Sequence, residues 1–178
     1  MNTGEQPAID ISVAAADADW EAVRNLFVGY FESLDAQVCK PALEREISAL
    51  PGVFGEAGGA VLVAWLDAGE ARHAIGCCAY RPGPEPGAAE MCRLYVSGNY
   101  RRGGLGRALA EAVQASAATE GYRHMVLHTL SHWDAALALY RSMGFGPGKA
   151  YGDVQGPDVV FLSAPLGTAP EQQATAGA

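Results

Sequence analysis

The pattern of apolar and polar positions predicts alternating strands and helices along most of the chain. Apolar residues recur at helical spacing from about residue 17 to 34, and a second, short helix is predicted from Pro41 to Leu50. Two more helices are expected over 105–120 and 133–143, because a glycine follows each of these periodic segments. Strand-length apolar runs cover 8–15, 59–67, 71–80, 90–96, 124–130 and 158–166.

The order of these segments predicts a mixed α/β fold. Residues 59–67, 71–80 and 90–96 are separated by turn-rich segments, so they are expected to form an antiparallel meander. Helix 105–120 then joins strand 90–96 to strand 124–130, which is a βαβ unit with parallel pairing and a right-handed crossover. We therefore expect a mixed sheet flanked by helices in one domain over 8–166, with a flexible N-terminus (1–7) and a disordered tail (167–178).

Composition narrows the class of protein. The chain is 49% hydrophobic and 18% charged, so it can fold around a core, and its net charge of −8 has the wrong sign for a protein that coats nucleic acid. The longest apolar run, Gly59–Leu66, is about eight residues long, whereas a membrane span needs about 20. The N-terminus lacks the basic and apolar regions of a secretory signal. A cytoplasmic protein with no nucleic-acid or membrane partner is expected.

The four cysteines are expected to be free thiols that pack in the interior. They form no C-x-x-C pair, and a reducing cytosol keeps thiols reduced. On a strand, the adjacent Cys77 and Cys78 should point to opposite sides, one into the core and one away from it. The other two are Cys39 and Cys92.

A glycine-rich segment, Arg101 to Arg107 (RRGGLGR), lies between a predicted strand and a predicted helix and is a candidate phosphate site. Glycines let a ligand approach the backbone, and the first N–H groups of the helix lack internal partners. No Lys-Ser or Lys-Thr follows these glycines, so the P-loop pattern is absent, and the third position of a dinucleotide fingerprint is Leu109. The pattern R-x-x-G-x-G is met by Arg101, Gly104 and Gly106. The alternative is a segment that only turns the chain and caps the helix.

At this point the sequence resembles the GNAT N-acetyltransferase superfamily. A second motif, A-x-x-L-Y-x-x-x-G-F from Ala136 to Phe145, begins 35 residues after Arg101, and the upstream run EMCRLYV is similar to the family's fourth strand. The resemblance covers roughly residues 8 to 166. It implies that an acetyl group passes from acetyl-CoA, the co-substrate, to a primary amine of a small molecule or peptide. The amine would attack directly in a ternary complex, with no metal.

The resemblance also assigns the cofactor to particular residues. The pyrophosphate would lie on the amides of the glycine loop, and the pantetheine arm and acetyl group along the fourth strand, where one amide would polarise the thioester carbonyl. Many members carry an asparagine seven residues before the motif tyrosine, whereas this chain has Trp133, so one cofactor hydrogen bond is unassigned. The cofactor-binding candidates are Leu94, Tyr95, Val96, Arg101, Arg102, Gly103, Gly104, Leu105, Gly106 and Arg107.

Two residues are the catalytic candidates that the resemblance implies. Tyr140 matches the family's tyrosine, the general acid for the departing CoA thiolate. Glu90 would deprotonate the amine, and partial burial is expected to raise its pKa. His128 or plain solvent is the alternative base. The spacing of His124, His128 and His132 would suit a metal only on a helix, and on a strand no metal site is expected.

The resemblance implies that the acceptor pocket lies along the first helix, the loop between the first two helices and the hairpin region from Phe145 to Pro157. Aromatic and carboxylate side chains there suit a cationic amine or a peptide amino group. A catalytically silent CoA or acyl-CoA sensor and a transferase of longer acyl groups are the alternatives, and a homodimer is possible. The substrate-binding candidates are Tyr30, Phe31, Glu32 and Phe54, with Asp35 and Tyr151 as further lining residues.

Overall fold

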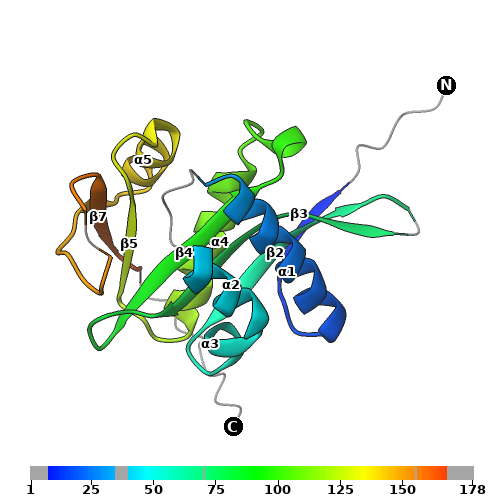
Figure 1. Ribbon diagram of the computed structural model, residues 1–178, viewed down its shortest axis with the longest axis horizontal. Helices are drawn as coiled ribbons and strands as arrows, with labels where there is room; N and C mark the ends of the chain where they lie inside the picture. Colours follow the sequence, from blue (N-terminus) through cyan, green and yellow to red (C-terminus); the bar gives the residue numbers. More distant parts are fainter. Residues whose placement is uncertain (1–7, 35–39, 70, 155, 168–178) are drawn as a thin grey trace, which may run out of the picture.

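A seven-stranded sheet, with helices on both faces, is formed by the residues that the computed structural model describes, which are 8–34, 40–69, 71–154 and 156–167 (Figure 1). The predictions for 1–7, 168–178, Asp35 and Cys39 lie outside these ranges. The strands are β1 (Ile9–Val13), β2 (Ala60–Asp67), β3 (Arg72–Pro82), β4 (Ala88–Val96), β5 (His124–Leu130), β6 (Gly146–Pro147) and β7 (Val159–Pro165). The helices are α1 (Asp17–Glu32), α2 (Lys40–Ser48), α3 (Gly52–Gly55), α4 (Leu105–Thr119) and α5 (Asp134–Ser142), with a 3-10 turn at Gly98–Tyr100.

The strand order is β1-β2-β3-β4-β5-β7-β6. β4 and β5, which α4 connects, pair in parallel, and each of the other neighbouring strands in this sheet pairs antiparallel. The predicted mixed sheet and the meander of β2, β3 and β4 are thereby confirmed. The sequence did not predict α3 and β6, because elements of four and two residues are too short to show a period.

Two apolar layers hold the helices to the sheet. On one face, Val23 and Phe27 of α1 pack against Val63 and Cys77. On the other, α4 and α5 pack against a separate set of sheet residues that includes Cys78. In Figure 1, α1, α2 and α3 lie in front of the sheet and α4 lies behind it.

The two core layers correct one expectation about the cysteines. Cys77 and Cys78 do point to opposite sides of β3, but both are fully buried, because helices cover both faces. Burial raises the pKa of both thiols. Both cysteines are therefore free thiols that pack in the core, as predicted, and neither faces away from it.

The sheet opens between β4 and β5. Their pairing is confined to Ala88–Glu90 opposite His124–Val126. On its other side, β4 stays paired with β3 as far as Val96, around a β-bulge at Arg93, whose φ is +57°. Beyond Glu90, the β5-facing backbone groups of β4 therefore have no strand partner within the described residues. This opening, which we call the fork, positions the candidate site.

Candidate active site

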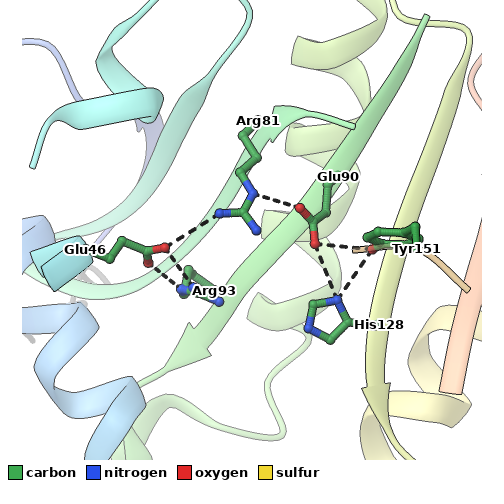
Figure 2. A network of polar contacts seen from close by, with 6 residues as sticks. All are labelled: Glu46, Arg81, Glu90, Arg93, His128 and Tyr151. Atoms are coloured by element: carbon green, nitrogen blue, oxygen red, sulfur yellow. Dashed lines mark hydrogen bonds and ion pairs between the residues drawn. The ribbon is translucent and has the colours of Figure 1, made fainter. Parts of the chain in front are cut away.

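A network of polar side chains surrounds Glu90, at the point where β4 and β5 separate (Figure 2). Glu90 is 6% exposed. Nε of Arg81, from β3, donates to its Oε2 at 2.7 Å. On the other oxygen, Oε1, the Tyr151 hydroxyl donates at 3.2 Å and Nδ1 of His128 lies 3.3 Å away. Side chains from β3, from β5 and from the segment between β6 and β7 thus contact one carboxylate of β4.

The network continues to a second carboxylate, Glu46 of α2. Arg93, the bulged residue, donates from Nε to Oε1 at 2.6 Å and from Nη2 to Oε2 at 2.8 Å, which is a bidentate pair. Arg81 lies between the two glutamates, with its Nη1 3.7 Å from Oε2 of Glu46 (Figure 2). Two arginines therefore balance two glutamates.

The structure corrects the expectation that the pKa of Glu90 is raised. Burial alone would raise it, but hydrogen bonds with His128 and Arg81 and the charge of the Arg81 guanidinium outweigh burial and lower the pKa from 4.5 to about 2. Glu90 is therefore an anion near neutral pH. A carboxylate that holds its proton so weakly is a poor proton acceptor but a strong hydrogen-bond acceptor.

His128 is the group in this network that can take up a proton. Its Nδ1 lies 3.3 Å from Oε1 of Glu90 and 3.5 Å from the Tyr151 hydroxyl; in the tautomer that carries its hydrogen on Nδ1 and donates to the carboxylate, Nε2 is the acceptor. Figure 2 shows the second ring nitrogen on the side away from Glu90. The rings of Tyr151 and Phe161 pack against the imidazole at 6.0 and 6.2 Å, and the side chain is 27% exposed. A partly exposed imidazole that a carboxylate orients is suited to act as a general base.

Tyr140 lies on α5 and is 8% exposed, with its ring packed edge-to-face on Phe145 at 5.7 Å. Burial raises the pKa of its phenol, and the charges of Cys78, Tyr30 and Cys92 raise it further. The raised pKa keeps this hydroxyl protonated, so that it is available as a hydrogen-bond donor.

The glycine loop leads into the N-terminus of α4. Gly104 precedes the helix with a φ of +82°, a left-handed conformation that favours glycine. A Cβ at this position would meet no other atom within 4 Å, so the space beside the loop is open. The amides of Leu105, Gly106 and Arg107 are the first of the helix and have no carbonyl partner within it. This end can bind an anion.

Two of the three loop arginines hold the loop itself. Nε of Arg101 donates to the carbonyl of Val96 at 2.9 Å, and its guanidinium lies over the Tyr95 ring at 5.8 Å. Arg107 pairs with Glu111 at 3.4 Å and contacts the hydroxyl of Ser142. These contacts tie the loop to the end of β4 and to α5.

The acceptor candidates lie at different places. Tyr30 and Phe31, at the end of α1, have their rings 5.8 and 5.7 Å from the Arg93 guanidinium and so border the network. Glu32 is exposed. Phe54 lies apart from the network: it is 2% exposed and packs on Phe27 in the core.

Two surface hollows of about 700 Å³ each lie away from the network. One lies between α1 and α3, and the other lies between α1 and the hairpin of β2 and β3. Neither hollow is lined by Glu90 or His128. The candidate site is therefore defined by the polar network around Glu90 and not by either hollow. Within the described ranges, no three His, Cys, Asp or Glu side chains gather to hold a metal ion, and no helix is long and apolar enough to span a membrane.

The sequence analysis missed Arg81, Arg93 and Glu46. A signal for Arg81 was present, because a hairpin centred on the turn between β3 and β4 pairs Arg81 with Glu90. Arg93 and Glu46 are 47 residues apart, and they meet only because of the bulge in β4 and the packing of α2. Neither feature leaves a recognisable pattern in a single sequence.

Comparisons with known proteins agree with this architecture. Residues 20–145 match the model of the acetyltransferase (GNAT) family. An uncharacterized N-acetyltransferase of Schizosaccharomyces pombe is 30% identical over 154 residues, which are 86% of this chain and 93% of the relative.

Solved structures share the fold. A GNAT-family acetyltransferase from Staphylococcus aureus superposes with a TM-score of 0.72 at 14% identity, over 90% of this chain and 100% of the other. A ribosomal-protein-alanine N-acetyltransferase from Brucella melitensis gives a TM-score of 0.68 at 24% identity, over 88% and 99%. The chain therefore belongs to the GNAT acetyltransferase family, and it is an acyltransferase that uses an acyl-CoA as co-substrate.

Proposed function

We propose that the protein transfers an acetyl group from acetyl-CoA to the primary amine of a small molecule or peptide, by direct attack while both substrates are bound. One observation carries this proposal. The fork between β4 and β5 has the Glu90–His128 pair where the strands separate, and the free N-terminus of α4 follows the far end of β4.

The residues of the fork suit acetyl-CoA. The amides of Leu105, Gly106 and Arg107 and the dipole of α4 would hold the pyrophosphate. The β5-facing backbone groups from Leu94 to Val96 have no strand partner among the described residues and would hold the pantetheine arm. Acetyl-CoA supplies the acetyl group as a thioester, which an amine can attack.

His128 would take the proton that the amine loses. The amine must be neutral to attack, and Nε2 of His128 is turned toward space that the carboxylate does not occupy. Glu90 would keep the ring oriented and balance the charge that the imidazole gains. Glu90 is thus a positioning residue, and His128 takes the role of base that the sequence analysis gave first to Glu90.

Tyr140 would supply the proton that the departing thiolate needs. The new C–N bond forms as the C–S bond breaks, and the sulfur leaves with the electron pair of that bond. The Tyr140 hydroxyl, which burial keeps protonated, would donate to this sulfur, and a backbone N–H between Leu94 and Val96 would stabilise negative charge on the carbonyl oxygen.

Isothermal titration with acetyl-CoA, and in parallel with CoA, tests the cofactor half of the proposal. A thiol-release assay with a panel of amines tests the transfer. Micromolar binding with amine-dependent release of CoA supports the proposal. Binding without release for any amine would favour the sensor alternative, and no binding at millimolar acetyl-CoA would contradict the proposal.

A further inference from the structure

Both carboxylates beside the fork are already paired, and this bears on which acceptor the site can bind. Arg93 occupies both oxygens of Glu46. Arg81 occupies one oxygen of Glu90, while Tyr151 and His128 share the other. Each oxygen of both glutamates thus already has a donor from the chain, which weakens its attraction for the ammonium group of an acceptor, and the four charges of the network sum to zero.

Arg81, in contrast, has donors to spare. Its Nε and Nη1 face Glu90 and Glu46, whereas its Nη2 has no hydrogen-bond partner among the described residues. The side chain is 32% exposed, compared with 13% for Arg93. A guanidinium carries five N–H donors in a fork that matches a carboxylate. Arg81 thus presents unused cationic donors to solvent beside the proposed base.

The network also fixes how Arg81 lies relative to His128. Both contact the same carboxylate group, Arg81 through Oε2 of Glu90 and His128 through Oε1 (Figure 2). The guanidinium and the imidazole thus lie on the two oxygens of one carboxylate, and a small molecule with both an anionic group and an amine would have to span that separation to contact both.

We infer that the acceptor is a small amino acid, whose carboxylate binds Arg81 while its amine faces His128. This inference rests on the proposed acetyl transfer and narrows its acceptor. A zwitterion has no net charge and so matches a network whose charges cancel, whereas a purely cationic amine would bring an unbalanced charge beside Arg81 and Arg93. The other acidic candidate, Glu32, is exposed, and an exposed carboxylate binds a cation weakly. A lysine side chain within a protein has no carboxylate a few bonds from its amine, and neither has a peptide N-terminus unless the peptide begins with Asp or Glu.

The test compares each of the common amino acids with its carboxamide and with the corresponding decarboxylated amine, by kcat/KM in the thiol-release assay. Amidation also makes the amine less basic, so rates are compared per neutral amine. The free acid of the preferred amino acid should be used at least about tenfold better than its amide, because a charge-assisted pair with Arg81 is lost. Equal use of the amide or of the decarboxylated amine would overturn the inference.

Arg81→Gln and Arg81→Lys separate carboxylate binding from a role through Glu90. If Arg81 binds the acceptor, Arg81→Gln erases the preference for the acid over the amide, and Arg81→Lys retains part of it. An equal loss of rate on both acceptors, with the preference intact, would mean that Arg81 acts only through Glu90 and would overturn the inference. Arg72→Gln is the control, since Arg72 lies at the other end of β3, stacked on Trp65 at 4.3 Å, and the preference should persist.

The same assay tests the proposed acetyl transfer and the inferred amino-acid acceptor separately. Release of CoA with amides and peptides as readily as with amino acids would leave the proposed transfer standing and remove the inference. No release with any amine would remove both.

Discussion

Glu90 and His128 share one contact, yet their surroundings give them different chemistry. The glutamate is almost fully buried and accepts a hydrogen bond from Tyr151, while Arg81 and His128 keep it ionised. The histidine is partly exposed and has one ring nitrogen turned away from these groups. The family resemblance suggested Glu90 as the first candidate for the base, because the sequence shows that Glu90 opens the predicted strand 90–96 but not which donors surround it.

His128→Gln should lower kcat by about a hundredfold or more, since general-base catalysis contributes about 10²- to 10⁴-fold. His124→Gln is the matched control, because His124 lies four residues earlier on the same strand and is exposed. A His128→Gln enzyme that retains both its rate and its pH profile would show that solvent or another group takes the proton.

Tyr140→Phe should lower kcat at least about tenfold and leave the affinity for acetyl-CoA unchanged. The ring still fills its place against Phe145, so only the hydroxyl is lost. Titration calorimetry measures the affinity, and the thiol-release assay measures the turnover. Unchanged turnover would remove Tyr140 from the mechanism and leave it as an aromatic anchor of α5.

At the scale of elements, the sequence predicted the helices, strands and turns that short-range residue patterns specify. The βαβ unit, the glycine loop and α5 are found where periodicity and glycines indicated, within a few residues. The fork was not predicted from local patterns, because it depends on how far β4 and β5 stay paired and on the bulge at Arg93. The contact of Glu46 with Arg93 depends on how α2 packs, and no local pattern specifies that.

Substitutions at two glycines, one in the glycine loop and one at the other end of α4, distinguish the effect of backbone strain from the effect of acetyl-CoA binding. Gly104→Ala should weaken acetyl-CoA binding at least about tenfold, because alanine disfavours a φ of +82° and would displace the first amides of α4. Gly121→Ala is the matched control: Gly121 follows the other end of α4 with a φ of +93°, and a Cβ at either glycine would meet no atom within 4 Å.

Both alanine variants should lose about 1–2 kcal/mol of stability, measured by urea unfolding, since the backbone strain is the same in kind. Titration calorimetry should then find weaker acetyl-CoA binding in Gly104→Ala alone. Equal affinity in the two variants would mean that the loop amides do not hold the pyrophosphate.

At the scale of the whole molecule, the Glu46–Arg81–Glu90 network ties α2 to the middle of the sheet and links catalytic geometry to the free energy of unfolding. The pKa of Glu90 is about 2 in the folded protein and 4.5 as its ordinary value. The folded state therefore binds fewer protons than the unfolded state between these values. The stabilisation is fully present above about pH 4.5 and is lost as the pH falls toward 2.

Glu90→Gln should remove this pH-dependent part of the stability. A pKa shift of this size corresponds to roughly 3 kcal/mol, so the difference in unfolding free energy between wild type and variant should shrink by up to that amount from pH 5 to pH 2.5. Urea unfolding at several pH values measures it. Glu111→Gln, which removes one carboxylate from an exposed pair, should change the free energy by less than about 1 kcal/mol at neutral pH. A difference for Glu90→Gln that stays constant with pH would mean that Glu90 is not held ionised by its partners, and the assignment of the proton to His128 would then lose its electrostatic basis.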